Sequence, residues 1–287
     1  MKHNTLTRKV KPMAIEVFNR YEMKYRITNE QYLKLRERLS EHMESDEHSR
    51  NGEFYTICNI YYDTVHNDLI RRSIDGGVYK EKMRLRSYGT VGTDQKVFLE
   101  IKKKYKGLVN KRRTKIILQD AYDYFESGRK PEVQPFMNGQ VLEEIDYMKN
   151  RLELMPKLFL SYDRCAMFDR ENRDFRVTFD RNITARRYDL GLHYGVYGDK
   201  LIGEDEWIME IKIDNAMPLW MTQILSEFKI YKTSFSKYGT EYKALVAKRV
   251  ASGANIILSD KEEALCLNNY SMSQMTERSQ RAKHSFA

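Results

Sequence analysis

The sequence predicts an α+β protein in which a long antiparallel sheet carries interspersed helices. Segments that alternate apolar and charged residues with a period of two recur along the chain, as half-buried strands do. Short turn signals separate such segments, for example at residues 89–94 and 106–110. Strands and helices do not alternate regularly along the chain, which disfavours a parallel doubly wound sheet.

The central stretch, residues 80–115, shows the alternation most clearly. It predicts three successive strands at 80–86, 97–104 and 111–116. Each strand has an apolar face and a basic face, and residues 100–115 hold eight basic residues against one acidic residue. The basic face could simply meet solvent. Adjacent cationic strands repel each other unless an anion lies over them, so a sheet curled with this face inward would form a channel for a polyanion.

The N-terminal part predicts a strand followed by a helix. Residues 18–27 alternate, and Thr28 with Gln31 forms a capping-box signature for the start of a helix. A polar loop is expected at 43–52. The helix is expected to bury a stripe made of Tyr32, Leu35, Leu39 and Met43.

The remaining elements follow from the same patterns. Further strands are expected at 54–63, 157–170, 174–180 and 206–214. Further helices are expected at 67–73, 120–127, 140–151, 219–228 and 240–250. We expect one main domain over 15–250, between a flexible arm at 1–14 and a tail at 251–287.

Composition limits the class of protein and of partner. The chain has 287 residues, with 50 Lys and Arg against 41 Asp and Glu, and its formal charge of +9 favours an acidic partner. Three widely spaced cysteines disfavour a disulfide framework and fit a reducing cytoplasm. No apolar run approaches the roughly 18 residues of a membrane span. We therefore expect a cytoplasmic protein without a transmembrane segment, with attachment to a membrane-protein partner left open.

Basic side chains on the predicted charged faces suit the binding of phosphate. Arg binds phosphate with a bidentate fork, and Lys acts as a mobile point charge. Phosphoryl transfer needs mainly positioning and charge neutralisation, which a cage of fixed cations supplies. Arg112 and Arg113 compete for one inward position, and the alternation favours Arg113. The candidates are Lys24, Lys82, Arg84, Arg86, Lys102, Lys104, Arg113, Arg176 and Lys212 and, outside a clear alternation, Arg164 and Lys237.

Carboxylates on the same faces are candidate ligands for a divalent metal, which would bridge phosphate oxygens and needs hard oxygen ligands. These carboxylates are Glu22, Glu100, Asp180 and Glu210. Glu22 and Glu100 could instead pair with neighbouring cations, and Asp180 with Arg181 or Arg186. No His or Cys cluster suggests zinc.

Eight short motifs occur in an order that resembles a known family. They are Arg20-Tyr21-Glu22-Met23-Lys24-Tyr25, Tyr61-Tyr62-Asp63-Thr64, Lys82-Met83-Arg84-Leu85-Arg86, Leu99-Glu100-Ile101-Lys102, Ser161-Tyr162-Asp163-Arg164, Arg176-Val177-Thr178-Phe179-Asp180, Met209-Glu210-Ile211-Lys212 and Phe235-Ser236-Lys237-Tyr238. The ordered set is similar to the polyphosphate polymerase domain of the vacuolar transporter chaperone (VTC) family, among the triphosphate tunnel metalloenzymes. The resemblance spans residues 18–250.

The resemblance implies an antiparallel β-barrel with helices packed around it and a basic tunnel as its bore. Members transfer the γ-phosphate of ATP onto a growing polyphosphate chain with manganese or magnesium, so ATP and polyphosphate are the expected partners. The motifs assign catalytic phosphate contacts to Lys24, Arg84, Arg86, Lys102, Arg164, Arg176 and Lys237. The substrate-binding surface would be completed by Lys82, Lys104, Arg113, Lys212 and Tyr238. The metal ligand would be Glu210, with Glu22, Glu100 and Asp180 as further candidates.

One position separates activities within this superfamily. Hydrolytic relatives commonly begin with Glu-x-Glu-x-Lys, whereas this chain places Arg20 at the first Glu position, before Glu22 and Lys24. The exchange of a carboxylate for a cation favours a polymerase. An inorganic triphosphatase and a non-catalytic module that binds polyphosphate or inositol phosphates stay open as alternatives. Nucleic acid is not expected, because the basic strands lack an adjacent aromatic stacking platform.

Overall fold

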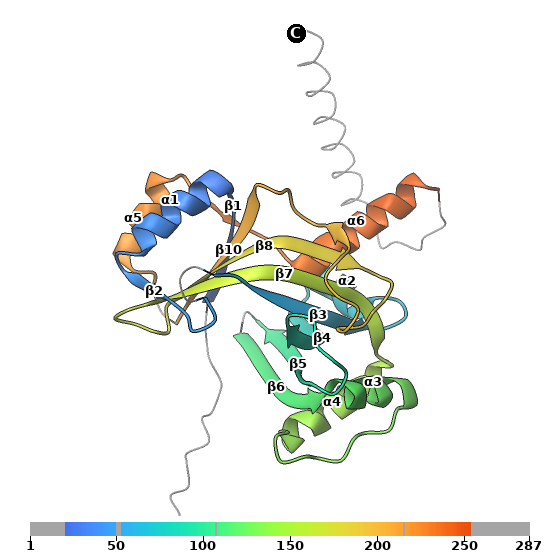
Figure 1. Cartoon of the computed structure of the whole chain (residues 1–287). Coiled ribbons are helices and arrows are strands. Elements are labelled where there is room, and N and C mark those ends of the chain that lie inside the picture. The colour runs from blue at the N-terminus through green and yellow to red at the C-terminus, as the bar shows by residue number, and fades with distance from the viewer. Residues whose placement is uncertain (1–20, 50–52, 107, 215, 254–287) are drawn as a thin grey trace, which may run out of the picture.

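A computed structural model describes residues 21–49, 53–106, 108–214 and 216–253 (Figure 1). The strands are β1 (Tyr21–Thr28), β2 (Met43–Ser45), β3 (Tyr55–Asp63), β4 (Tyr79–Tyr88), β5 (Lys96–Tyr105), β6 (Leu108–Ile117), β7 (Met155–Asp169), β8 (Arg176–Arg186), β9 (Asp199–Lys200), β10 (Glu206–Ile213) and β11 (Lys232–Thr233). The helices are α1 (Asn29–Leu39), α2 (Asp68–Ile74), α3 (Leu118–Ser127), α4 (Gly139–Leu152), α5 (Leu219–Glu227) and α6 (Lys237–Ala251). The expected arm at 1–14, Arg20 and most of the expected tail lie outside the described residues.

The described strands form one antiparallel sheet, which confirms the predicted α+β class. Hydrogen-bonded neighbours follow the path β11-β1-β10-β8-β7-β3-β4-β5-β6, with β2 beside β7 and β9 beside β8. We call the face that carries Lys24, Arg84 and Arg164 the concave face and the other the outer face. The predicted alternation holds on β4, where Met83 and Leu85 are fully buried under the outer face.

Three apolar cores hold the helices against this sheet. On the outer face, α3 and α4 cover β4 and β5 through Leu85, Leu99 and Ile145, and lie at the bottom of Figure 1. Also on the outer face, α1 and α5 cover β8 and β10. On the concave face, α6 covers the part of β7 that carries Leu158 and Leu160. The charged part of the concave face therefore lies beyond the area that α6 covers.

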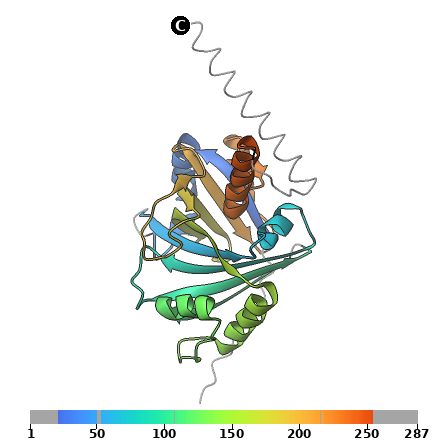
Figure 2. The same cartoon turned by 90° about the vertical axis from the view of Figure 1, so that its right-hand side faces the viewer.

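The sheet curls so strongly that strands from its two halves approach each other (Figure 2). On the hydrogen-bonding path, β1 and β5 are six strands apart, which would separate them by about 29 Å in a flat sheet with 4.8 Å between strands. Lys102 Nζ on β5 nevertheless lies 3.5 Å from Glu22 Oε2 on β1. The concave face thus brings side chains from distant strands into contact.

The expected closed barrel is wrong. Within the described ranges, the sheet ends at β11 on one side and at β6 on the other, and these two strands do not pair. Residues 235–237 lie between β1 and β4 without forming a strand. Lys24 Nζ on β1 donates to the Phe235 carbonyl at 3.0 Å, and Lys82 Nζ on β4 donates to Ser236 Oγ at 3.2 Å. Side-chain contacts to this segment therefore link the two halves of the open sheet.

Several element boundaries differ from expectation, among them the following two. Met43 does not extend the stripe of α1, because the helix ends at Leu39 and Met43 begins β2, paired with Asp169 of β7. Met43 lies four residues after Leu39, and this spacing correctly predicted that Met43 is buried. It is buried in a strand and not in the helix. Strand β8 runs to Arg186, beyond the expected end at residue 180, because β7 offers it a long partner strand.

Candidate functional site

Cross-strand register places opposite charges beside each other on the concave face. The directly opposed pairs are Lys24–Glu210, Glu22–Lys212, Arg164–Asp180, Arg84–Glu100 and Glu100–Arg113. Opposed residues in a sheet have Cβ atoms about 4.5–5.5 Å apart, so each carboxylate lies within reach of a cation. Basic side chains outnumber carboxylates on this face, and the surplus positive charge points into the space that the sheet encloses.

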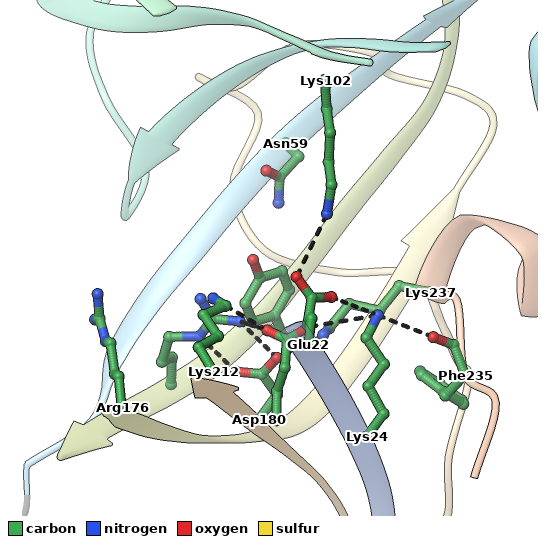
Figure 3. A network of polar contacts seen from close by, with 12 residues as sticks. Glu22, Lys24, Asn59, Lys102, Arg176, Asp180, Lys212, Phe235 and Lys237 are labelled. Atoms are coloured by element: carbon green, nitrogen blue, oxygen red, sulfur yellow. Dashed lines mark hydrogen bonds and ion pairs between the residues drawn. The ribbon is translucent and has the colours of Figure 1, made fainter. Parts of the chain in front are cut away.

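One cluster joins β1 and β10 at the centre of the concave face (Figure 3). Lys24 Nζ lies 3.3 Å from Glu22 Oε1 and 3.4 Å from Glu210 Oε1, and Lys212 Nζ lies 3.3 Å from Glu210 Oε2. Burial by itself would raise the pKa of Glu210, but Lys212, Lys24 and Arg164 hold that pKa well below its usual range. Glu210 is therefore an anion at neutral pH, with Glu22 beside it.

Asp180 lies in a second cluster, where both of its oxygens are engaged. Arg164 donates two parallel hydrogen bonds to the carboxylate, 2.6 Å from Nε to Oδ1 and 2.8 Å from Nη2 to Oδ2. Lys237 also donates to Oδ2, and Asp180 is fully buried. Burial opposes its charge, yet Arg164 and Lys237 lower its pKa. Asp180 thus fixes two cations in place, and neither Arg181 nor Arg186 is its partner.

Glu100 has the same anchoring role on β5. Arg84 Nη2 lies 2.7 Å from Glu100 Oε2, and Lys111 Nζ lies 3.3 Å from Oε1. Burial would raise the pKa of Glu100, but Arg84, Arg86 and Lys111 lower it strongly. Arg86 Nε in turn donates to Asn59 Oδ1 at 2.9 Å, so both arginines have fixed positions.

Several concave-face groups titrate near neutrality. Desolvation lowers the pKa of Lys82 to about 8, and the charges of Lys102 and Lys24 add to the shift. Desolvation also lowers the pKa of Lys111 to about 7, with repulsion from Arg84 and other arginines. Because 42% of the Lys111 side chain is exposed, repulsion is the better supported cause there. Burial opposes ionisation of Tyr61, but Arg84 and Lys82 lower its pKa to about 8.

The comparisons with known proteins identify the family of the chain. A family model for the VTC domain matches residues 19–246. The chain belongs to the VTC domain family. No curated protein matches the sequence.

Two solved structures have a related chain trace. A proposed adenylate cyclase from Bacillus halodurans is 14% identical, with a TM-score of 0.46 over 76% of this chain and 95% of its own. The PH1819 protein from Pyrococcus horikoshii OT3 is also 14% identical, with a TM-score of 0.40 over 78% of this chain and 99% of its own.

Among the four candidate metal ligands of this VTC domain, Glu22 and Glu210 fit a divalent ion best. Both oxygens of Asp180 accept hydrogen bonds from Arg164 and Lys237, which disfavours Asp180 as a ligand. Glu100 is fixed through Oε2, which accepts from Arg84, and lies on β5, away from the Glu22–Glu210 pair. Glu22 and Glu210 lie beside the same Lys24 ammonium and face the enclosed space. No group of three His, Cys, Asp or Glu side chains that could hold a metal occurs in the described part of the chain. Two carboxylates suit Mg²⁺ or Mn²⁺ that takes its other ligands from substrate phosphates and water.

The alternation on β6 separates Arg112 from Arg113 as predicted. Arg113 opposes Glu100 on the concave face, and its guanidinium lies 4.7 Å from the centre of the Phe98 ring. Arg112 points to the outer face, where it donates to Glu144 of α4 at 2.9 Å.

Other expected site residues lie farther from the centre. Arg176 pairs with Asp46 at 3.1 Å and points away from the central cluster (Figure 3). Lys104 is exposed near the end of β5. Tyr238 is 3% exposed, and its hydroxyl donates to Asp63 Oδ2 at 3.1 Å. It packs α6 against the sheet and so supports its neighbour Lys237.

Sequence reasoning left Lys111 out of the site, although its place on the alternating basic face was visible. The structure puts it opposite Lys102 and within 3.3 Å of Glu100. Asn59 and Tyr61 gave no such signal, because their importance comes from contacts to Arg86 and Arg84 across strands. None of the helices in the described ranges has the length and apolarity needed to cross a membrane.

Proposed function

We propose that this VTC domain is a metal-dependent polyphosphate polymerase, which transfers the γ-phosphate of ATP onto the end of a polyphosphate chain. One observation carries the proposal. Cations from β1, β5, β7 and β10 surround the carboxylate pair of Glu22 and Glu210, because the sheet curls enough to bring Lys102 against Glu22. A dense set of fixed cations suits a linear chain of phosphates.

In the proposed reaction, an oxygen of the chain's terminal phosphate attacks the γ-phosphorus of ATP. A new P–O bond forms there, the bond from the γ-phosphorus to the β-bridging oxygen breaks, and ADP leaves with that oxygen. Arg84, Arg86 and Arg164 hold the phosphates in line, and Lys24 and Lys237 neutralise the negative charge of the transferring group. A divalent ion at Glu22 and Glu210 would supply Lewis-acid polarisation of the γ-phosphate. No side chain needs to become a covalent nucleophile.

The direct test incubates the full chain with ATP and Mn²⁺ and resolves the products on a gel. Long chains with little free orthophosphate are expected. Release of orthophosphate without chains would instead identify an inorganic triphosphatase, in which water is the nucleophile. Tight tripolyphosphate binding with no turnover under any divalent ion would identify a non-catalytic polyphosphate or inositol-phosphate module. Either result would overturn the proposal that this domain is a polyphosphate polymerase.

Glu210→Gln tests the proposed metal ligand. We expect chain synthesis to fall on the order of 100-fold, because the ion loses one of its two carboxylates. The matched control is Glu144→Gln, which removes an outer-face carboxylate that pairs with Lys103 and Arg112. Thermal unfolding of both variants checks the fold. Undiminished synthesis in folded Glu210→Gln would remove Glu210 from the mechanism.

The proposed catalytic unit is residues 15–250, acting in the cytoplasm on ATP and polyphosphate. Truncation to this range should keep synthesis near that of the full chain, measured by the same gel. A loss of activity without a loss of folding would assign a catalytic part to the arm or the tail.

A further inference from the structure

A row of aromatic side chains crosses three neighbouring strands at one edge of the charged region. Tyr55 on β3, Tyr88 on β4 and Phe98 on β5 form this row, which we call the aromatic ledge. The ring centres of Tyr55 and Tyr88 lie 6.0 Å apart, and Phe98 meets Tyr88 edge-on at 6.0 Å. Both distances are typical of interacting rings, so the ledge is a fixed surface.

The aromatic ledge lies on the concave face, directly beside the arginines. Phe98 opposes Arg86 across β4 and β5, and Tyr55 opposes Arg164 across β3 and β7. These are nearest-neighbour positions in a sheet. The expectation that the basic strands have no aromatic platform beside them is therefore wrong, because the register brings together rings that are far apart in the sequence.

Tyr88 of the aromatic ledge is exposed to solvent, whereas another pair of rings on the concave face is buried. Tyr88 is 44% exposed, although the ring of His48 stacks on one of its faces, with the ring centres 5.8 Å apart and the planes at 22°. At the opposite part of the concave face, Tyr61 and Tyr238 also pair, at 5.1 Å, but both are buried where α6 packs against the sheet. A ring that served packing alone would be expected to resemble that second pair. Tyr88 instead keeps a free surface next to phosphate-binding cations.

We propose that the aromatic ledge binds the base of the nucleotide substrate by stacking, chiefly on Tyr88. This inference rests on the proposed function, in which ATP supplies the phosphate. In ATP a single ribose separates the base from the phosphates. On the concave face the aromatic ledge is likewise only one strand away from phosphate-binding side chains, because Phe98 opposes Arg86 and Tyr55 opposes Arg164. Stacking reads the π-face of a base and not its edges, so the ledge favours purines over pyrimidines and distinguishes poorly between ATP and GTP.

The test compares two ligands that differ in having a base. Affinities of the full chain for ATP and for inorganic tripolyphosphate are measured by calorimetry in EDTA, which suspends metal-dependent turnover. Tyr88→Ala is expected to weaken ATP binding by about 5- to 100-fold, the range that loss of one base–aromatic stack gives. Tripolyphosphate affinity should stay within about twofold. Tyr88→Phe, which keeps the ring, should restore ATP binding.

Tyr105→Ala is the matched control. Tyr105 is 52% exposed on the neighbouring strand, but alternation places it on the outer face, so ATP binding should not change. An equal loss for both ligands in Tyr88→Ala, or no loss for ATP, would overturn the stacking site and leave the phosphate site standing. Failure of the wild-type chain to bind tripolyphosphate would overturn the proposed function and this inference together.

Discussion

Arg112 and Arg113 are neighbours in sequence but belong to opposite faces of β6. Arg113 faces the enclosed space beside Glu100, and Arg112 is held by Glu144 on the outer face. Arg113 therefore lies on the face that has surplus positive charge, whereas Arg112 forms an ion pair with Glu144 on the other face.

Arg113→Ala should weaken tripolyphosphate binding by about 10- to 150-fold, because a charge-assisted hydrogen bond contributes about 1.5–3 kcal/mol. Arg112→Ala is the control, and its affinity should match the wild type. Calorimetric titration of both variants gives the comparison. Equal losses would mean that the two arginines act through net charge alone, against the assignment of faces.

Lys82 and Lys111 give the site a dependence on pH. The pKa of each lies below the ordinary value for lysine, at about 8 and about 7. Both are therefore fully charged only below these values, and tripolyphosphate affinity should fall as pH rises from 6.5 to 9. Ionisation of the ligand works in the opposite direction, so a fall must come from the protein.

Lys111→Arg should flatten the lower part of this profile, because arginine stays protonated throughout. The measurement is the dissociation constant of tripolyphosphate at several pH values at constant ionic strength. Affinity that rises steadily with pH in the wild type would contradict the assigned lysine states.

At the scale of elements, local signals place α1 correctly. Thr28 Oγ1 accepts from the Gln31 backbone N–H at 3.2 Å, and the Thr28 backbone N–H donates to Gln31 Oε1 at 3.0 Å. The predicted capping box therefore forms as expected, and the helix buries Tyr32, Leu35 and Leu39.

Thr28→Ala should lower the free energy of unfolding by about 1 kcal/mol, because the first turn of α1 loses its cap. Urea denaturation measures the change, and Thr90→Ala in the exposed turn between β4 and β5 serves as the control. Tripolyphosphate affinity should stay unchanged, since α1 lies on the outer face. A change below about 0.3 kcal/mol would show that packing alone determines where α1 begins.

For the whole molecule, curvature converts a charged surface into an enclosed site. The contact of Lys102 with Glu22 joins strands that would be about 29 Å apart in a flat sheet. Residues 235–237 then bridge β1 and β4 by accepting hydrogen bonds from Lys24 and Lys82. The site is thus held by a curved open sheet and one bridging segment.

Tripolyphosphate binding should weaken more than tenfold between 50 and 500 mM salt, because the site relies on summed positive charge that ions screen within about 10 Å at 0.1 M. Lys82→Gln should give a shallower plot of log affinity against log salt, whereas Lys103→Gln on the outer face should not. Calorimetry across the salt series provides the slopes. A slope equal in both variants would contradict a site confined to the concave face.

The sequence by itself determined which residues share a face. Alternation separates Arg84 from Met83 and Arg113 from Arg112, and a capping box begins α1, because these features depend on residues a few positions apart. It also carried the motifs by which the VTC family was identified. The tertiary structure alone decided that the sheet stays open, that Asp180 and Glu100 anchor cations while Glu22 and Glu210 stay together, and that Tyr88 lies beside Tyr55 and Phe98. Those outcomes depend on curvature and on register between distant strands, and a period of two within one strand contains no information about either.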